Sequence, residues 1–322
     1  MAQGFWRTLP TPFFALAPLA NVTDAAFRRI VATYGKPDVM WSEFTSAAAI
    51  CTAPGDTAWR NLLYMEAERP IVAQLWGADP VAMEQAAAVV AALGFDGLDL
   101  NMGCPDRTVE KQGAGAVLCQ HPARAQDLIR AARRGAGDLP VSVKIRIGYA
   151  RNDIETWLPR LLAEEPAAIT IHARTRQEKS DVPARWDVVS RAVAIRHSLG
   201  SATLIIGNGD VRDLTEARQK ARDTGVDGVM LGRAIFGNPW LFHPYVGRDI
   251  LPVTARLRVL VEHAMLFERL LGDIKPLEHM KKHYKAYVSG WAGAEDLRLR
   301  LMATHTTAEL AAACDTYVAS RD

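Results

Sequence analysis

A single cysteine in a short loop is the side chain of this sequence best placed for chemistry. Cys104 lies between Gly103 and Pro105, directly after the apolar run at residues 97–100. A thiol on a loop that follows a strand end can be reached by a ligand, and its ionisation can be tuned by its neighbours. Pro105 and the short glycine-bearing loop argue against a buried thiol. We therefore expect Cys104 to be accessible and to take part in a reaction.

Polar side chains end almost every apolar run in the first three quarters of the sequence. Any one of them could be a strand-end cap or a solvated rim residue. Packing alone would not select a polar residue at so many strand ends. As a set they predict a ring of hydrogen-bonding groups around one pocket. These residues are Glu43, Gln74, Asn101, Lys144, His172, Asn208, Asp210 and Arg233.

The elements that would position these residues alternate regularly between strand and helix. Short apolar runs occur at residues 13–19, 39–42, 71–75, 97–100, 141–145, 168–171, 203–206 and 228–231. Segments with apolar residues at three- and four-residue steps lie between them, at 80–93, 122–134, 154–163, 186–198 and 213–224. Eight such alternations predict an α/β fold, a (β/α)8 TIM barrel. An open doubly wound sheet is the alternative, but it usually has fewer repeats and a glycine-rich first turn.

Glycine-containing turns follow the last two predicted strands. They are Gly207-Asn208-Gly209-Asp210 and Gly232-Arg233. Glycine allows backbone N–H groups to point at oxygen atoms, and an arginine can add a bidentate contact. Two ordinary tight turns are the alternative, but barrels commonly bind phosphate after strands seven and eight. We therefore expect a phosphorylated cofactor at this end of the barrel.

After residue 245 the pattern becomes purely helical. Helical periodicity covers residues 254–271, 276–288, 294–302 and 307–318, with glycines at or between the segments. This predicts a catalytic barrel domain at 1–245 and an all-α helical bundle at 246–322.

Composition and cysteine usage restrict the class of protein. The 322 residues carry a formal net charge of +2, so any nucleic-acid surface must be local. The four cysteines form no CxxC pair, which favours a reducing compartment over disulfides or structural zinc, and no metal is expected. Residues 13–17 faintly resemble a signal peptide, but Pro10, Pro12 and Pro18 interrupt that run. We expect a cytoplasmic monomer that does not contact a membrane.

Several segments together resemble the tRNA-dihydrouridine synthases, FMN enzymes that reduce uridine in tRNA. The matching segments are 17–24 with Phe27 and Arg28, 101–105 with 113–116, 143–148, 171–176, 207–211 and 230–233. They run from residue 17 to about 240 in the order found in that family.

The resemblance implies a set of residues around FMN at the barrel mouth. Pro18 and Leu19 would lie against the flavin ring, and Gln74 would bond its pyrimidine edge. Lys144 would face the edge where negative charge develops on reduction, and His172 would bond the flavin or the incoming base. The phosphate would be held at the turns after strands seven and eight by Asn208, Gly209, Gly232 and Arg233, and Asp210 is expected among the cofactor-binding residues. NADPH is the implied reductant, and the sequence contains no dedicated site for it.

In the implied reaction, a hydride passes from N5 of reduced FMN to C6 of uracil and a proton reaches C5. Cys104 is the expected proton donor, because a thiol with an ordinary pKa near ~8.5 is protonated at neutral pH. A nucleophilic role would require a cationic neighbour or a helix start. Asn101 would position the uracil or the loop.

The resemblance also implies tRNA as the substrate and the helical tail as its binding domain. Lys275, Lys281, Lys282, His283 and Lys285 are expected on one helix with Tyr284 and Tyr287, and Arg298 on the next. Arg174 and Arg176, on the loop after strand six, are expected to meet tRNA phosphates. One rival is an FMN barrel dehydrogenase acting on a free pyrimidine, and another is an RNA-binding protein with a vestigial flavin site.

Overall fold

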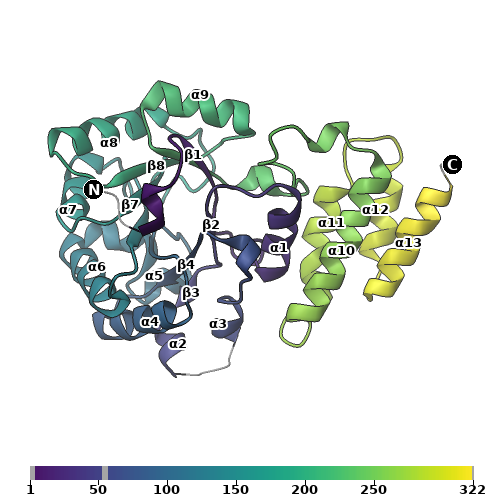
Figure 1. Cartoon of the computed structure of the whole chain (residues 1–322), viewed down its shortest axis with the longest axis horizontal. Helices are drawn as coiled ribbons and strands as arrows, with labels where there is room; N and C mark the ends of the chain where they lie inside the picture. Colours follow the sequence, from purple (N-terminus) through teal and green to yellow (C-terminus); the bar gives the residue numbers. More distant parts are fainter. Residues whose placement is uncertain (1–3, 53–56, 321–322) are drawn as a thin grey trace.

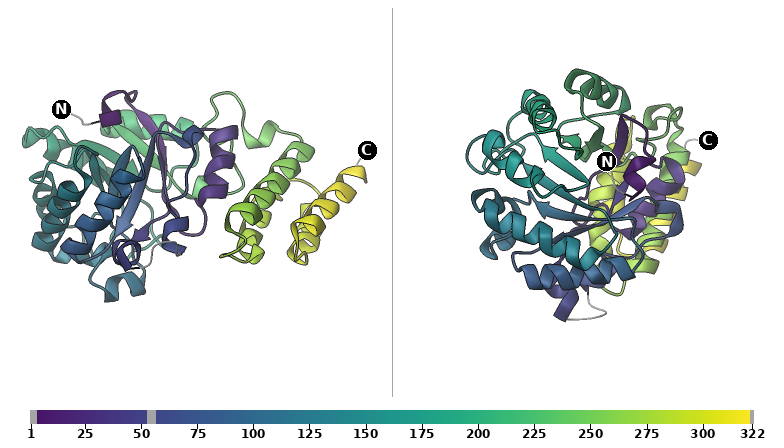
Figure 2. Two further views of the ribbon diagram at one scale, coloured as in Figure 1. Left: turned by 60° about the horizontal axis from the view of Figure 1, so that its bottom comes forward. Right: turned by 60° about the vertical axis from the view of Figure 1, so that its left-hand side comes forward.

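The computed structural model describes residues 4–52 and 57–320, and its centre is a barrel of parallel strands (Figures 1 and 2). The strand order is β1-β9-β8-β7-β6-β5-β4-β2, all parallel, and the short β3 (Thr45–Ser46) also pairs with β4. A hydrogen bond of 3.1 Å from the amide of Leu16 to the carbonyl of Val39 joins β1 to the segment before β2 and nearly closes the ring. The strands are β1 (Phe13–Leu16), β2 (Met40–Trp41), β4 (Ile71–Trp76), β5 (Gly97–Met102), β6 (Val141–Arg146), β7 (Ala168–His172), β8 (Leu204–Asn208) and β9 (Gly228–Leu231).

The eight predicted strands are all present, and the predicted barrel is confirmed. The first strand is shorter than residues 13–19, because β1 ends at Leu16 and the last sheet-like bond comes from Ala17 to Leu231. Pro18 has no N–H to donate, so it ends the pairing and begins a turn.

Helices cover the outside of the barrel and begin where the sequence supplies caps. Asp24, Asp79, Asp106 and Asp213 each accept a backbone N–H of the first turn that follows. The barrel helices are α1 (Ala25–Tyr34), α2 (Ala47–Thr52), α3 (Thr57–Arg60), α4 (Pro80–Ala92), α5 (Arg107–Lys111), α6 (Pro122–Ala136), α7 (Ile154–Leu162), α8 (Trp186–Ser198) and α9 (Leu214–Thr224). No helix in the described ranges is long and apolar enough to cross a membrane.

The C-terminal region contains α10 (Val253–Leu271), α11 (Lys281–Tyr287), α12 (Ala294–Met302) and α13 (Thr307–Ala319). The segment predicted as one helix at 276–288 is instead a 3-10 turn, Leu277–Met280, followed by α11. These helices share an apolar core with Ala26 and Ile30 of α1 and with Trp240. The helical region therefore packs against α1, as Figure 1 shows, and the boundary between residues 245 and 246 remains a prediction.

Two histidines are buried where the helical region meets the barrel. The rings of His263 and His283 lie 4.7 Å apart, and each lies 5.1 Å from the ring of Phe27. None of the four ring nitrogens has a hydrogen-bond partner among the described residues. Burial lowers the pKa of His263 to about 3 and holds the pKa of His283 well below its usual value, with Lys282 adding repulsion to both. Both rings are therefore neutral at neutral pH.

We expect this histidine pair to make the fold sensitive to acid. A histidine whose folded pKa is depressed stabilises the fold above its unfolded pKa and loses that contribution as the pH falls below it. Between pH 7 and pH 5 the free energy of unfolding should fall by roughly 2–4 kcal/mol. Urea unfolding at the two pH values measures this, and the double substitution His263→Phe with His283→Phe should flatten the dependence. An unaltered pH slope in that variant would show that other groups are responsible.

Candidate active site

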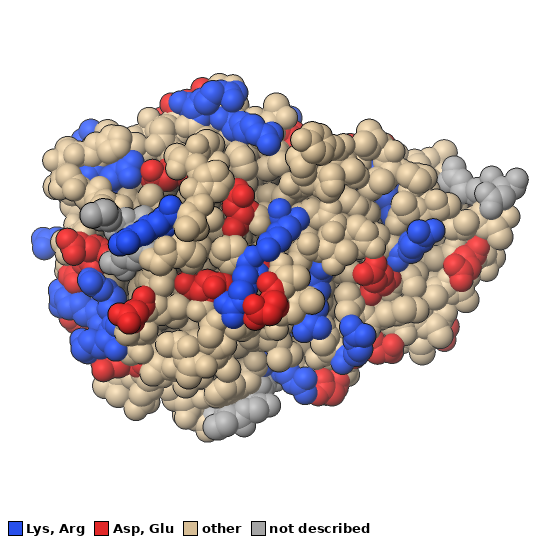
Figure 3. Space-filling model, viewed as in Figure 1, with Lys and Arg blue, Asp and Glu red and all other residues tan. Residues whose placement is uncertain are grey.

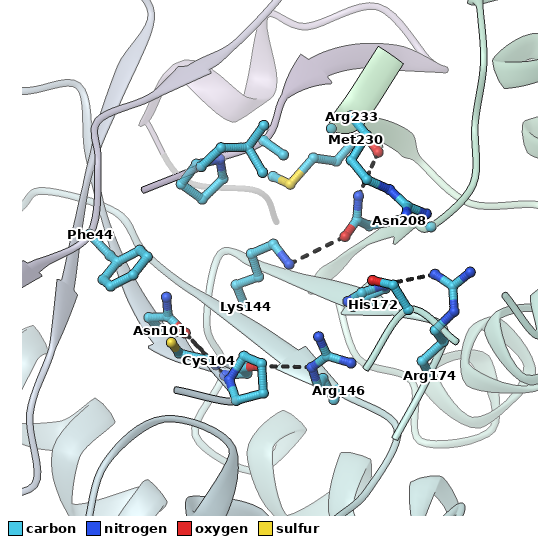
Figure 4. Close-up of a pocket in the computed structure, with 18 of the residues that line it drawn as sticks. Phe44, Asn101, Cys104, Lys144, Arg146, His172, Arg174, Asn208, Met230 and Arg233 are labelled. Atoms are coloured by element: carbon cyan, nitrogen blue, oxygen red, sulfur yellow. Dashed lines mark hydrogen bonds between the residues drawn. The ribbon is translucent and has the colours of Figure 1, made fainter. Parts of the chain in front are cut away.

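A pocket of about 320 Å³ opens at the carboxyl ends of the strands (Figure 4). Its lining comes from the loops and strand ends after β1, β4, β5, β6, β7, β8 and β9, as the topology of a barrel requires. The structure brings together most of the residues singled out in the sequence. Those lining the pocket are Pro18, Leu19, Gln74, Asn101, Cys104, Lys144, His172, Arg174, Asn208, Gly209, Asp210, Gly232 and Arg233.

Cys104 lines this pocket but is only 8 % exposed, so the expectation of an open thiol was wrong. The loop folds back on Val109 and Ala114, which form a small apolar cluster with the cysteine. Gly115 permits this close approach, since a Cβ there would lie 2.7 Å from the carbonyl oxygen of Cys104. Burial raises the pKa of the Cys104 thiol. The sulfur therefore stays protonated at neutral pH.

The backbone of the cysteine loop is fixed at each of its residues. Asn101 Oδ1 accepts the amides of Gly103 (3.1 Å) and Cys104 (2.9 Å). On the carbonyl side, Arg146 Nε donates to Gly103 at 2.9 Å and Arg176 donates to Pro105 at 3.3 Å. The carbonyl of Cys104 accepts the amide of Ala116 at 2.9 Å. The position of the thiol is therefore set by neighbouring strands and helices rather than by the loop alone.

A series of hydrogen-bonded, buried side chains holds Asn101 in place. Asn101 Nδ2 donates to Gln74 Oε1 at 3.0 Å, and Gln74 Nε2 donates to Asp99 Oδ2 at 2.7 Å. Ser142 donates to the other oxygen of Asp99 at 2.6 Å. Gln74 is fully buried, and both ends of its amide are bonded within the protein. Its side chain thus holds Asn101 in this structure, where the sequence suggested a contact to flavin.

Two cations of β6 point into the pocket. Lys144 and Arg146 are two residues apart on one strand and so share a face. Lys144 Nζ donates to Asn208 Oδ1 at 3.3 Å, and Arg146 donates only to backbone carbonyls. Burial lowers the pKa of Lys144 to about 8 and that of Arg146 to about 10. Within the described residues neither forms an ion pair, which is costly unless a ligand supplies the anion.

Arg146 was not singled out as a site residue in the sequence. The apolar run of the sequence ends at residue 145, whereas β6 continues to Arg146. Alternation along the strand was the available signal, because it places residue 146 on the same face as Lys144.

The turns after β7 and β8 hold a second charged group. His172 Nε2 lies 3.2 Å from Arg174 Nη1, and a guanidinium can only donate, so the proton of the neutral ring is on Nδ1. Burial and the surrounding cations hold the pKa of His172 well below its usual value. Asp210 accepts from both Arg174 and Arg233, at 2.6 Å for the latter, and from the amide of Ala184. Asp210 thus orients two arginines, and because it is an anion itself it would contribute to a phosphate site only by holding them in place.

The charge balance of the pocket fits an anionic ligand. Lys144, Arg146, Arg174 and Arg233 line it, against the single carboxylate of Asp210. Gly209 adopts φ +132°, and a Cβ there would lie 2.8 Å from that of Ala184, so the turn requires glycine. The apolar side of the pocket is formed by Ala17, Pro18, Leu19 and Met230. Such a site suits a flat ring system that carries a phosphate.

Arg174 is only 2 % exposed, so it faces the pocket rather than an outer rim. The other four basic residues predicted to contact tRNA lie elsewhere. Arg176 is ion-paired with Glu110 beside the cysteine loop. Lys282 donates to the backbone carbonyl of Asn21, and Arg298 to that of Val288 at 3.5 Å. Lys281 is half-buried on α11.

The expected basic and aromatic face of the tail is only partly present. Lys275 is buried and paired with Glu43, and His283, Tyr284 and Tyr287 belong to the core of the helical region. Their apolar sides face inward, because α11 packs against both α10 and α12. Lys285 is exposed on that helix. Glu43, which we expected in the pocket ring, contributes to the contact with the helical region instead.

The barrel and the pocket together define a parallel (β/α)8 barrel protein with a cationic site at the strand ends. Solved structures with this fold include histamine dehydrogenase from Rhizobium sp. 4-9, with a TM-score of 0.54 and 14% sequence identity over 79% of this chain and 48% of that chain. A 2-naphthoyl-CoA reductase complex has a TM-score of 0.52 and 11% identity over 71% of this chain and 49% of that chain. At these identities the likeness concerns the fold alone.

Residues 15–321 match the family model "Dihydrouridine synthase (Dus)". A probable tRNA-dihydrouridine synthase 2 of Bacillus subtilis (strain 168) is 39% identical over 98% of this chain and 97% of its own length. A probable tRNA-dihydrouridine synthase of Staphylococcus aureus (strain COL) is 38% identical over 100% of this chain and 98% of its own length. The chain belongs to the dihydrouridine synthase family, and it is a flavin-dependent oxidoreductase.

Proposed function

We propose that this protein is an FMN-dependent tRNA-dihydrouridine synthase that uses NADPH to reduce the C5=C6 bond of uridines in tRNA. It would act as a monomer in the cytoplasm. The observation that carries the proposal is that one pocket holds two features. One is the protonated thiol of Cys104 on a loop fixed by hydrogen bonds, and the other is the pair of buried cations of β6, Lys144 and Arg146, which form no ion pair in the described residues. Bound FMN, once reduced, would supply the hydride that C6 of the uracil receives.

Cys104 would supply the proton that the uracil needs at C5. The raised pKa of the thiol keeps this proton on sulfur at neutral pH. The loop contacts hold Sγ in one place, so a base that enters the pocket meets the donor in a fixed orientation. Asn101 holds this loop by accepting two of its amides, and after turnover the thiolate would take a proton from water.

The cationic residues would hold the cofactor and the charge that develops on it. Lys144 would place an ammonium group beside the ring, and Arg233 with the Gly209 and Gly232 turns would hold the phosphate. Pro18 and Leu19 would pack against the ring. Neutral His172 would donate through Nδ1–H, because its Nε2 already accepts from Arg174. Arg146 would orient the base, since it lines the pocket and its guanidinium donates to the cysteine loop.

The tRNA would lie across the mouth of the pocket and the helical region, with the target uridine turned out of its stack. Lys281 and Arg298 are candidates for phosphate contacts on that region. On the face shown in Figure 3, Lys and Arg side chains are interspersed with Asp and Glu over both parts of the molecule. On that face, an RNA contact would rest on separate basic residues rather than on one continuous basic surface.

A substrate comparison tests the proposed function. Purified protein should carry FMN and, with NADPH, form dihydrouridine in unmodified tRNA but leave free uracil and orotate unreduced. Reduction of a free pyrimidine with no effect on tRNA would favour the FMN barrel dehydrogenase. Binding of tRNA by protein that takes up no flavin would favour the vestigial-site alternative.

A further inference from the structure

A buried ion pair joins the helical region to the barrel beside the pocket. Lys275 Nζ lies 3.0 Å from Glu43 Oε2, and both side chains are nearly buried, at 8% and 5% exposed. The other oxygen of Glu43 accepts the backbone amide of Asn21. The carbonyl of Asn21 accepts from Lys282. We call Asn21, Glu43, Lys275 and Lys282 the Asn21 network.

Asn21 belongs to the turn that forms one side of the pocket. Ala17, Pro18, Leu19 and Ala20 line the cavity immediately before it. Asn21 has φ +55°, a left-handed conformation that an asparagine adopts only at a modest cost. Both polar backbone groups of this residue are occupied by the network, one through a carboxylate that is itself paired with the helical region. The conformation of the turn therefore depends on how the helical region is seated.

The burial of the Lys275–Glu43 ion pair is not explained by a gain in stability. A buried ion pair commonly contributes no more to stability than well-packed apolar residues, whereas it fixes geometry strictly. Asp24 lies close enough to Glu43 that burial and this second carboxylate raise the pKa of Asp24 to about 6. Two acidic groups are thus held near each other at the base of the turn, with Lys275 as the cation between the barrel and the tail.

We infer that Glu43, Lys275 and Lys282 are positioning residues for the flavin side of the pocket, and that Lys282 serves this purpose rather than binding an RNA phosphate. The inference rests on the proposed function, because it assigns the turn at residues 18–23 to flavin contact. Through this network, the helical region sets the affinity of the pocket for FMN.

Flavin titration and salt-dependent tRNA binding separate the two roles of Lys282. Flavin-free protein is titrated with FMN while flavin fluorescence is followed, for the wild type, Lys282→Met and the matched control Lys285→Met. Lys285 is exposed on the same helix and has no contact with the turn in the described structure. Lys282→Met should raise the FMN dissociation constant by about 3- to 30-fold, and Lys285→Met should leave it unchanged.

A lysine that binds an RNA phosphate would give the opposite result when it is replaced. Removing one phosphate contact lowers the slope of log K against log salt for tRNA binding by about 0.7–0.9. Lys282→Met should retain the wild-type slope. A reduced slope with unchanged FMN affinity would overturn the inference for Lys282.

A double-mutant cycle tests the ion pair itself. Lys275→Met leaves the Glu43 carboxylate unpaired and should weaken FMN binding, whereas Glu43→Gln retains an acceptor for the Asn21 amide. In the double variant the effects on FMN affinity should be non-additive, because the residues act as one unit. If Lys275→Met does not fold, Glu43→Gln and Lys282→Met still decide the matter.

The outcomes also separate this inference from the proposed function. Wild-type protein that binds no FMN would contradict the proposed function. If every folded variant binds FMN as tightly as the wild type does, only the inference about the Asn21 network is contradicted.

Discussion

Cys104→Ala should lower turnover on tRNA by about 10²–10⁴-fold, the range for a lost general acid. The alanine removes the thiol of the loop, while the loop itself stays held by Asn101, Arg146 and Ala116. FMN binding should be retained, because the cations that line the pocket are unaffected. Dihydrouridine formed per bound flavin, under single-turnover conditions, measures the effect.

Cys104→Ser provides the matched control for shape. A hydroxyl has nearly the same size but a much higher pKa, so proton transfer should remain slow although the loop is undisturbed. Flavin reduction by NADPH should proceed at the wild-type rate in both variants, since it requires no proton from this thiol. Wild-type activity on tRNA in Cys104→Ala would refute the assignment.

Lys144→Met should have the second large effect, about 10²–10³-fold on turnover, the range for a lost electrostatic stabiliser. Methionine fills a similar volume without the charge. The buried ammonium has no ion-pair partner among the described residues, so its removal should leave the free energy of unfolding unchanged or raise it. Flavin content, turnover and urea unfolding, measured on the same preparation, test both parts.

The dependence of kcat/KM on pH identifies the contribution of the Lys144 ammonium group. The pKa of Lys144 is lowered to about 8, so the ammonium is present below that pH and is lost as the pH rises through it. The kcat/KM of the wild type should fall above about pH 8, and this limb should be absent in Lys144→Met. The same alkaline limb in the variant would assign it to another group, such as the Cys104 thiol.

The regular elements were predictable because their physical signals are local. Apolar runs and helical periodicity located the eight strands and the long helices, with boundaries that shift by a few residues. Helix α1 was not among the predicted segments, and helices α2, α3 and α5 and the two-residue β3 were missed because segments this short carry no periodic signal. The predicted helix at 276–288 was split, since Pro276 begins a 3-10 turn rather than the helix itself.

The site was predictable as a set of residue types but not as a set of contacts. Strand-end polarity found most of the polar side chains that line the pocket, because every strand of a parallel barrel ends at one face. The sequence pattern could not show that Asp210 accepts hydrogen bonds from Arg174 and Arg233, or that Gln74 donates one to Asp99. Lys275 and Glu43 are 232 residues apart, so nothing in their local sequence connects them. The depth of Cys104 likewise depends on Gly115, whose effect is steric and three-dimensional.

The anchoring of residues 103–105 through main-chain atoms has a consequence for redox damage. A sulfhydryl that is 8 % exposed on a loop with a fixed backbone should be reached by water and a planar nucleobase more readily than by a bulky tripeptide thiol or a large alkylating agent. Cys104 should therefore form mixed disulfides with such thiols slowly, although water and a base in the pocket can reach it.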